Sequence, residues 1–300
     1  MTSPYRDNFR IKAYRFGSGK KTLAIVGTMR GDEVQQQYVC ARLVNELKML
    51  EQQGMIQPGK SITIIPSCNP FALNVSSRFW AMDNTDINRM FPGYDKGETT
   101  QRIAAAVFNA ISDAEYGIQM ASFYVSGDFV PHARVLQTGY EAVNEARLFG
   151  LPYVTIHKPL PFDTALLNYN WQVWNCKAFS LYAGTTNTVN TDNAQMMVDS
   201  VLRFMFKTDI ITQLPVMSSA YDSLVIQEED LFNIKASHAG IIQHMKKVGE
   251  MVREGETIAN IIDTYNGSVL EEVKATRNGI LFFATNKPIV LQNHLLYKIQ

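Results

Sequence analysis

The sequence predicts an α/β fold, with a mixed, mostly parallel sheet covered by helices on both faces, followed by a small all-β domain. Two observations support this prediction. From residue 17 to about residue 206, short apolar runs alternate with longer helical patterns, which is typical of a parallel sheet packed between helices. After residue 207 the pattern changes to short strands separated by turn residues.

The α/β part contains apolar runs at residues 22–26 and 61–65, which are typical of strands buried on both faces. A segment rich in turn residues, 53–59, precedes the second run. The periodicity of apolar residues predicts helices over residues 33–52, 99–112 and 191–206. In such a sheet, ligands bind beside the carboxyl ends of the strands, so the loops that follow these strands are the first place to look for a site.

The C-terminal part has the spacing of an all-β domain, with Asn-Gly pairs at 266–267 and 278–279 that favour tight hairpins. Residues 248–258 resemble the Gly-x-x-Val-x-x-Gly-x-x-Ile turn of lipoyl- and biotinyl-like domains. The carrier lysine motif is not evident, which favours a structural role. Strands are expected at residues 232–236, 240–242, 258–262 and 268–273. We predict an α/β domain over residues 1–222 and a C-terminal β domain over residues 223–300.

The segment 27–33, Gly-Thr-Met-Arg-Gly-Asp-Glu, follows the first buried strand and leads into a helix. It resembles the Gly-x-x-His-Gly-Asp/Asn-Glu motif of the succinylglutamate desuccinylase/aspartoacylase family, whose members are zinc deacylases with a zinc-carboxypeptidase-like fold. In that motif the His and the Glu both bind zinc. The resemblance places Glu33 at the Glu position and Arg30 at the His position. An arginine is permanently charged and has no lone pair for a metal.

A second segment, residues 86–93 with the sequence Asp-Ile-Asn-Arg-Met-Phe-Pro-Gly, is similar to the family's Asp-Leu-Asn-Arg-x-Phe-Pro-Gly signature. In the family, the Asn-Arg pair holds the carboxylate of the substrate. By this resemblance Asn88 and Arg89 are substrate-binding residues, with Arg78 as a helper and Arg30 nearby. A guanidinium suits this role because it can bind a carboxylate through two parallel hydrogen bonds.

The remaining catalytic positions of the family are substituted. The family's Asp-Leu-His strand end matches residues 116–122, which places Gln119 at the Asp position and Ala121 at the position of the third zinc ligand. The family's Thr-x-Glu-x-Gly strand matches residues 178–184 and places Tyr182 at the position of the general base. Alanine cannot coordinate a metal, and a phenol is a poor base at neutral pH.

These substitutions leave Glu33 as the single retained zinc ligand, whereas a catalytic zinc usually needs about three protein ligands. Zinc is the cofactor of the family, and we expect none here. We expect Arg30 to form an ion pair with Glu33 or with a bound anion. The favoured hypothesis is a family member without zinc catalysis that binds small carboxylates or N-acyl amino acids.

Two alternatives stay open. The first is an active hydrolase of an amide bond whose missing groups are supplied by Tyr182, His132, His157 or Cys68. No two of the five histidines have the i,i+3 or i,i+4 spacing of a helical zinc motif. The second alternative is a structural protein that uses the β domain for assembly. Metal analysis and ligand screening distinguish these hypotheses.

The composition indicates an ordinary cytoplasmic protein. Lys plus Arg and Asp plus Glu both number 28, so no net charge favours nucleic acid. Residues 1–7 lack an apolar signal core, and no uncharged apolar run approaches the ~20 residues of a membrane span. Three cysteines far apart in the sequence suggest a reducing compartment. A homo-oligomer is compatible with the sequence, which does not specify the oligomeric state.

Overall fold

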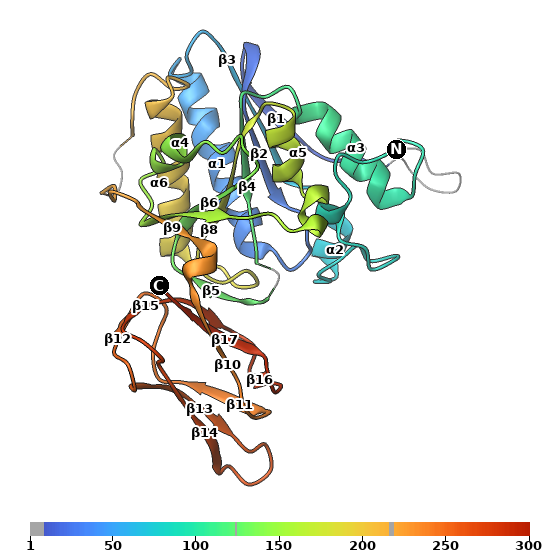
Figure 1. The fold of residues 1–300 in the computed structure, drawn as a ribbon. Helices are drawn as coiled ribbons and strands as arrows, with labels where there is room; N and C mark the ends of the chain where they lie inside the picture. Colours follow the sequence, from blue (N-terminus) through green and yellow to red (C-terminus); the bar gives the residue numbers. More distant parts are fainter. Residues whose placement is uncertain (1–8, 124, 216–218) are drawn as a thin grey trace.

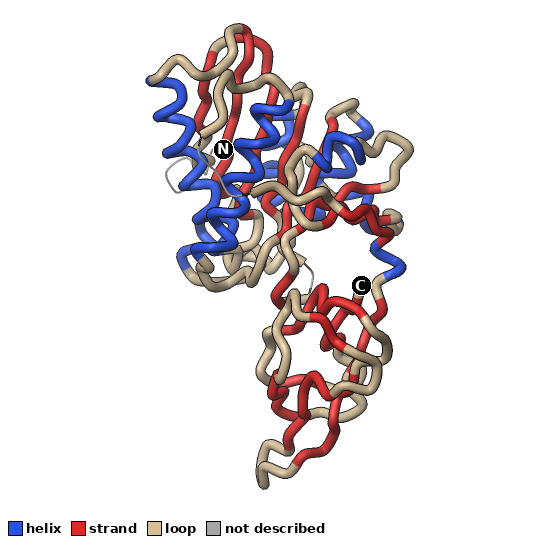
Figure 2. The backbone as a smooth tube through the Cα atoms, turned by 90° about the vertical axis from the view of Figure 1, so that its left-hand side faces the viewer, coloured by secondary structure: helices blue, strands red, loops and turns tan. Residues whose placement is uncertain are grey.

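The computed structural model describes residues 9–123, 125–215 and 219–300. Residues 1–7, for which the sequence predicts no signal core, lie outside this part. The chain forms an α/β domain and a C-terminal β domain that extends from one end of it (Figure 1). Figure 2 shows that the long helices lie in the α/β domain and that the other domain consists of strands and loops. The predicted fold class is confirmed.

Within the described residues, the α/β domain has an eight-stranded sheet with the order β1-β3-β2-β4-β8-β6-β7-β9. Five neighbouring pairs are parallel, and the pairs β1–β3 and β6–β8 are antiparallel. The strands are β1 (Tyr14–Gly17), β2 (Gly19–Thr28), β3 (Gly59–Ser67), β4 (Tyr116–Met120), β6 (His132–Leu136), β7 (Tyr153–His157), β8 (Lys177–Tyr182) and β9 (Leu224–Gln227).

The helices cover both faces of this sheet. The longest are α1 (Val34–Gln52), α3 (Thr99–Ile111) and α6 (Thr191–Lys207), and they confirm the three predicted helices to within one residue at each end. The shorter ones are α2 (Pro70–Asn74), α4 (Val143–Arg147) and α5 (Leu167–Val173) and the 3-10 helices η1 (Ile87–Arg89), η2 (Pro161–Ala165) and η3 (Glu228–Asp230).

Successive residues of β2 point into two different cores, as the period of two along a strand requires. Leu23 and Ile25 pack with side chains of α1 and α6. Ala24 and Val26 pack with side chains of α3 and α5. All four are buried, which explains why this strand is a continuous apolar run in the sequence. The strand is therefore held firmly from both sides up to Thr28, where the first loop of the candidate site begins.

The C-terminal domain consists of two antiparallel sheets around an apolar core. The four predicted strands correspond to β10, β11, β13 and β14. Gly267 has a positive φ of 76° in the connection of residues 263–268 between the paired strands β13 and β14, which is longer than the tight Asn-Gly hairpin expected there. The strands are β10 (Phe232–Lys235), β11 (Gly240–His244), β12 (Met251–Val252), β13 (Thr257–Ile262), β14 (Val269–Lys274), β15 (Gly279–Thr285), β16 (Ile289–Val290) and β17 (Leu295–Ile299).

Strand pairing crosses the predicted division at 222/223 in both directions. β9 lies beyond it in sequence but pairs in parallel with β7 in the large sheet. Conversely, β5 (Gly127–Phe129) lies in the α/β part of the sequence and pairs with β15 of the C-terminal domain. Phe129, Phe282 and Phe283 belong to one buried apolar cluster at this junction. The two domains therefore share backbone hydrogen bonds and a core, which places the C-terminal domain beside the cavity described below.

No helix in the described ranges is long and apolar enough to cross a membrane.

Candidate ligand-binding site

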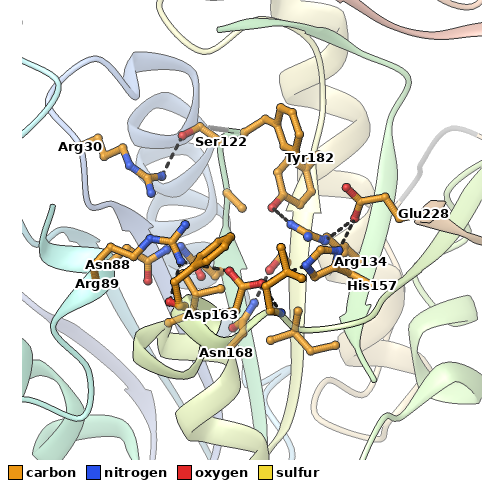
Figure 3. A pocket seen from close by; sticks show the side chains of 18 residues that line it. Arg30, Asn88, Arg89, Ser122, Arg134, His157, Asp163, Asn168, Tyr182 and Glu228 are labelled. Carbon is orange, nitrogen blue, oxygen red and sulfur yellow. Dashed lines mark hydrogen bonds and ion pairs between the residues drawn. The ribbon is translucent and has the colours of Figure 1, made fainter. Parts of the chain in front are cut away.

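A cavity of about 540 Å³ lies beside the carboxyl ends of β2, β4 and β8 (Figure 3). This is the edge at which open α/β sheets bind ligands, and the volume is in the range of small-molecule pockets. Arg30 follows β2, Ala121 follows β4, and Tyr182 ends β8. All three line the cavity. The fold thus brings together the three substituted positions, which are up to about 150 residues apart in the sequence.

Glu33 is buried and all of its hydrogen bonds are made within the protein. Its Oε2 accepts hydrogen bonds from the backbone N–H groups of Met29 at 2.7 Å and Arg30 at 3.0 Å. Its Oε1 accepts from Arg30 Nη1 at 3.1 Å and from the hydroxyl of Ser122. The loop between β2 and α1 therefore closes around the carboxylate, and the ion pair predicted between Arg30 and Glu33 is confirmed.

The guanidinium of Arg30 lies between two carboxylates. In addition to its bond to Glu33, Nη1 donates to the hydroxyl of Ser122, and Nε and Nη2 donate to Asp86 Oδ2 at 3.2 and 2.8 Å. Four of its five N–H groups, two on Nη1 and one each on Nε and Nη2, thus have protein acceptors. Burial acts to lower the pKa of Arg30, but the two carboxylates outweigh it and raise the pKa above its ordinary value.

The residues at the family's metal positions do not fit zinc. Glu33 binds a guanidinium, Arg30 itself carries a permanent positive charge, and Ala121 has no donor atom in its side chain. Gln119 lines the cavity at the Asp position, where its Nε2 contacts Met29 Sδ at 3.7 Å. In residues 9–123, 125–215 and 219–300, no group of three or more His, Cys, Asp or Glu side chains could hold a metal ion.

Asn88 and Arg89 lie on η1 and line the cavity. Asn88 Oδ1 accepts a hydrogen bond from the backbone N–H of Leu167 at 3.2 Å, and Arg89 Nη1 donates to the carbonyl of Phe162 and to Asp163 Oδ1, both at 3.1 Å. Among the described residues, Asn88 Nδ2 and Arg89 Nε and Nη2 have no protein acceptor. These nitrogen atoms remain available as donors to a ligand.

Arg78, the proposed helper, has a different position. Its Nη1 donates to Asp32 Oδ2 at 2.8 Å and its Nη2 donates to the carbonyl of Phe123 at 2.9 Å. It is not among the described residues that line the cavity. Arg78 therefore connects two loops behind the site, and Arg89 is the better placed of the two for a ligand.

Tyr182 lines the cavity, and its hydroxyl accepts a hydrogen bond from Arg134 Nη1 at 3.1 Å. The ring of His132 stacks on the ring of Tyr182, with 4.8 Å between centroids and an interplanar angle of 3°. His132 Nδ1 lies 2.8 Å from the carbonyl of Val130. Burial lowers the pKa of His132 to about 4, so this ring is neutral at neutral pH and supports Tyr182 from behind the cavity.

Of the other groups considered as substitutes for the missing catalytic residues, His157 lines the cavity and Cys68 does not. His157 lies between two carboxylates, with Nε2 3.1 Å from Asp163 Oδ2 and Nδ1 3.2 Å from Glu228 Oε2. Cys68 is completely buried, and burial raises the pKa of its thiol. A buried thiol of this kind is a poor nucleophile.

Six charged or polar residues of the cavity were not predicted from the sequence: Ser122, Arg134, Asp163, Asn168, Ser180 and Glu228. Asp163 and Glu228 follow β7 and β9, which run opposite to β8, so the strand-end rule does not predict that they meet the loops after β2, β4 and β8. Arg134 lies in the middle of β6, which runs antiparallel to β8, and Asn168 lies on a helix. No sequence pattern marks these two positions.

The fold and the cavity together define an α/β protein with a mostly parallel sheet, a ligand-sized cavity beside its strand ends and an appended antiparallel β domain. A family model described as the succinylglutamate desuccinylase/aspartoacylase catalytic domain matches residues 19–204. The chain belongs to this family.

Among characterised proteins, the chain is similar to N-alpha-acetyl-L-2,4-diaminobutyric acid deacetylase of Halomonas elongata. The two are 26% identical over 285 residues, which cover 90% of this chain and 79% of the relative. Two solved structures share the fold. A succinylglutamate desuccinylase/aspartoacylase from Rhodobacter sphaeroides has a TM-score of 0.78 at 21% identity, covering 96% of this chain and 87% of that chain. The product-bound ectoine utilization protein EutE (DoeB) from Ruegeria pomeroyi has a TM-score of 0.79 at 17% identity, covering 96% and 88%.

Replacement of Arg30 will destabilise the fold. Arg30→Gln leaves the carboxylates of Glu33 and Asp86 without their counter-ion, and breaking a buried pair in this way costs about 3–5 kcal/mol. The matched control is Arg147→Gln, because its ion pair with Asp222 is exposed, at 46% and 92%, and should contribute about 0–1 kcal/mol. Urea unfolding at neutral pH measures both. Equal, small losses in the two variants would contradict the structural role assigned to Arg30.

The free energy of unfolding will decrease at acid pH, and protonation of Glu228 will account for part of this decrease. Burial acts to raise the pKa of Glu228, but Arg134, His157 and Lys298 outweigh it and lower the pKa well below its ordinary value. This stabilisation is complete above the unfolded pKa of about 4.3 and is lost as the pH falls through the folded pKa. Unfolding free energies measured from pH 7 to pH 3 should therefore decline less in Glu228→Gln than in the wild type. Asp113→Asn, at a carboxylate 64% exposed, should keep the wild-type slope.

Proposed function

We propose that this family member does not use zinc and binds a small carboxylate or an N-acyl amino acid without hydrolysing it. One observation carries the proposal: the cavity and its Asn88-Arg89 pair are retained, while an ion pair of Arg30 and Glu33 takes the place of the metal arrangement. Without zinc, the family mechanism has neither an activated water nor a Lewis acid for the scissile carbonyl.

The carboxylate is assigned to Arg89 and Asn88 because their free donors are directed at the same cavity. A guanidinium offers two parallel N–H groups that match a carboxylate in geometry and charge. Arg30 was a further candidate, but two carboxylates already neutralise it. Arg78 pairs with Asp32 outside the cavity lining. The preference for a carboxylate therefore rests chiefly on Arg89.

Asn168 favours a ligand that also contains an amide. This side chain is 3% exposed and lines the cavity, and its Nδ2 contacts the hydroxyl of Ser180. Its Oδ1 has no hydrogen-bond donor among the described residues. The Asn168 amide can both donate and accept hydrogen bonds, so it can pair with the amide of an N-acyl amino acid at the cavity wall. Leu136, Leu160 and Leu166 add apolar walls for an acyl group.

A second candidate function is amide hydrolysis by a rearranged site. It is favoured by the relative named as a deacetylase and by the presence of Tyr182 and His157 in the cavity lining. An assay of N-acetyl amino acids, with and without added divalent metals, separates the two functions. The first proposal expects no turnover. Turnover that Tyr182→Phe abolishes would favour the second.

We also place this protein in the cytoplasm, because Cys40, Cys68 and Cys176 are all buried free thiols, which suits a reducing compartment. Neither nucleic acid nor a membrane is part of the proposal. A homo-oligomer is compatible with it.

Loss of Arg89 will weaken ligand binding selectively. A hydrogen bond to a charged group contributes ~1.5–3 kcal/mol, so Arg89→Ala should raise the dissociation constant for N-acetylaspartate or succinate by roughly ten- to a hundredfold. Isothermal titration calorimetry measures this directly. Arg147→Gln is the matched control and should bind like the wild type, because Arg147 pairs with the exposed Asp222 and lies outside the cavity lining. Unchanged affinity in Arg89→Ala, or equal affinity of the wild type for a neutral amide of the same size, would refute the assignment.

A further inference from the structure

We propose that the cavity contains a second anion-binding subsite, formed by Arg134 and Tyr182, and that the preferred ligand is therefore a dicarboxylate that spans the cavity from Arg89 to Arg134. This inference rests on the proposed function, because it assigns a second contact to the ligand of the same cavity. Neither Arg134 nor Tyr182 belongs to the family's zinc-binding or Asn-Arg motifs.

Positive charge exceeds negative charge around Glu228. This single carboxylate faces three basic groups: Arg134 Nε at 2.8 Å, His157 Nδ1 at 3.2 Å and Lys298 Nζ at 3.5 Å. Even if the imidazole of His157 is neutral, the two positive charges of Arg134 and Lys298 exceed the one negative charge of Glu228. The side chains of Arg134, Glu228 and Lys298 are only 14%, 15% and 10% exposed, so water screens this excess poorly.

The neighbouring carboxylate does not remove the excess. Asp163 pairs with Arg89 Nη1 and with His157 Nε2, so it lies between the Arg89 and Arg134 sides of the cavity and balances Arg89. Burial lowers the pKa of Lys298, Glu228 acts to raise it, and Arg134 adds a smaller lowering effect. An anionic group of a ligand would supply the missing negative charge.

Arg134 and Tyr182 also have hydrogen-bond donors that no described residue accepts. Arg134 Nη1 donates to the hydroxyl of Tyr182. Its Nε lies 2.8 Å from Glu228 Oε2 in an ion pair that lacks hydrogen-bond geometry, and its Nη2 has no acceptor among the described residues. Tyr182 accepts the bond from Arg134, so its own O–H is also without a described acceptor. Both residues line the cavity. A guanidinium N–H beside a phenol O–H forms a site for one carboxylate.

The two subsites lie on opposite sides of the cavity. In Figure 3, Asn88 and Arg89 are on one side and Tyr182 and Arg134 on the other, with Asp163 and Asn168 between them. The third arginine of the lining, Arg30, is unsuitable for a second carboxylate because it already pairs with both Glu33 and Asp86. A ligand with one carboxylate can satisfy one side only.

The test compares each of three dicarboxylates (succinate, glutarate and adipate) with its monoamide by isothermal titration calorimetry. The monoamide has the same length and retains one carboxylate. At the best chain length, the wild type should bind the dicarboxylate at least about tenfold more tightly than the monoamide. Arg134→Gln should remove this preference and leave the monoamide affinity within about twofold. Arg89→Ala should weaken both ligands, and Arg147→Gln should weaken neither.

Two further variants guard against misfolding of Arg134→Gln. Arg134→Lys keeps the charge but loses the planar pair of donors, and Tyr182→Phe removes only the hydroxyl; each should reduce the preference by about threefold to tenfold. Equal binding of dicarboxylate and monoamide, or a preference that survives in these variants, overturns the second subsite alone. If no ligand of either kind binds to the wild type, the proposed function is wrong and the subsite with it.

Discussion

The structure of the site depends on one interaction, the buried contact of the Arg30 guanidinium with Glu33 and Asp86. It joins the loop after β2 to the loop that carries η1, and through the hydroxyl of Ser122 it reaches the end of β4. In a zinc enzyme of this family, a divalent cation would draw such oxygen ligands together. Here a side chain supplies the positive charge, so the loops can be held without a metal ion.

Under the function that we propose, this arrangement keeps the cavity in place without a metal ion. The sheet and its two cores hold the strand ends in position, and the ion pair fixes the loop that follows β2. The charges that remain directed at the cavity are those of Arg89 and Arg134, each partly balanced by one carboxylate, Asp163 or Glu228. Lys298, from the C-terminal domain, completes the second group. The appended domain therefore contributes to the electrostatics of the site as well as to its packing.

The sequence was informative where a physical pattern is local. Buried strands, amphipathic helices and the motifs around Glu33 and Arg89 are all readable in short windows, and the ion pair of Arg30 follows from charge and proximity. The role of Arg134 was not readable, because an arginine in the middle of a strand is usually a solvated residue and only the antiparallel pairing of β6 with β8 brings it to Tyr182. The boundary between the two domains could not be located from the sequence either, because β5 and β9 each pair with a strand on the other side of it. Such long-range pairings leave no signal in a single sequence.

The metal content of the wild-type protein tests the central claim most directly. The protein would be produced in zinc-replete medium, dialysed, and analysed for zinc by mass spectrometry, beside Glu33→Ala. Because Arg30 occupies the coordination position and Ala121 offers no ligand, the account predicts well under one equivalent of zinc per chain in both proteins. One equivalent of zinc that resists dialysis in the wild type and is lost in Glu33→Ala would contradict it.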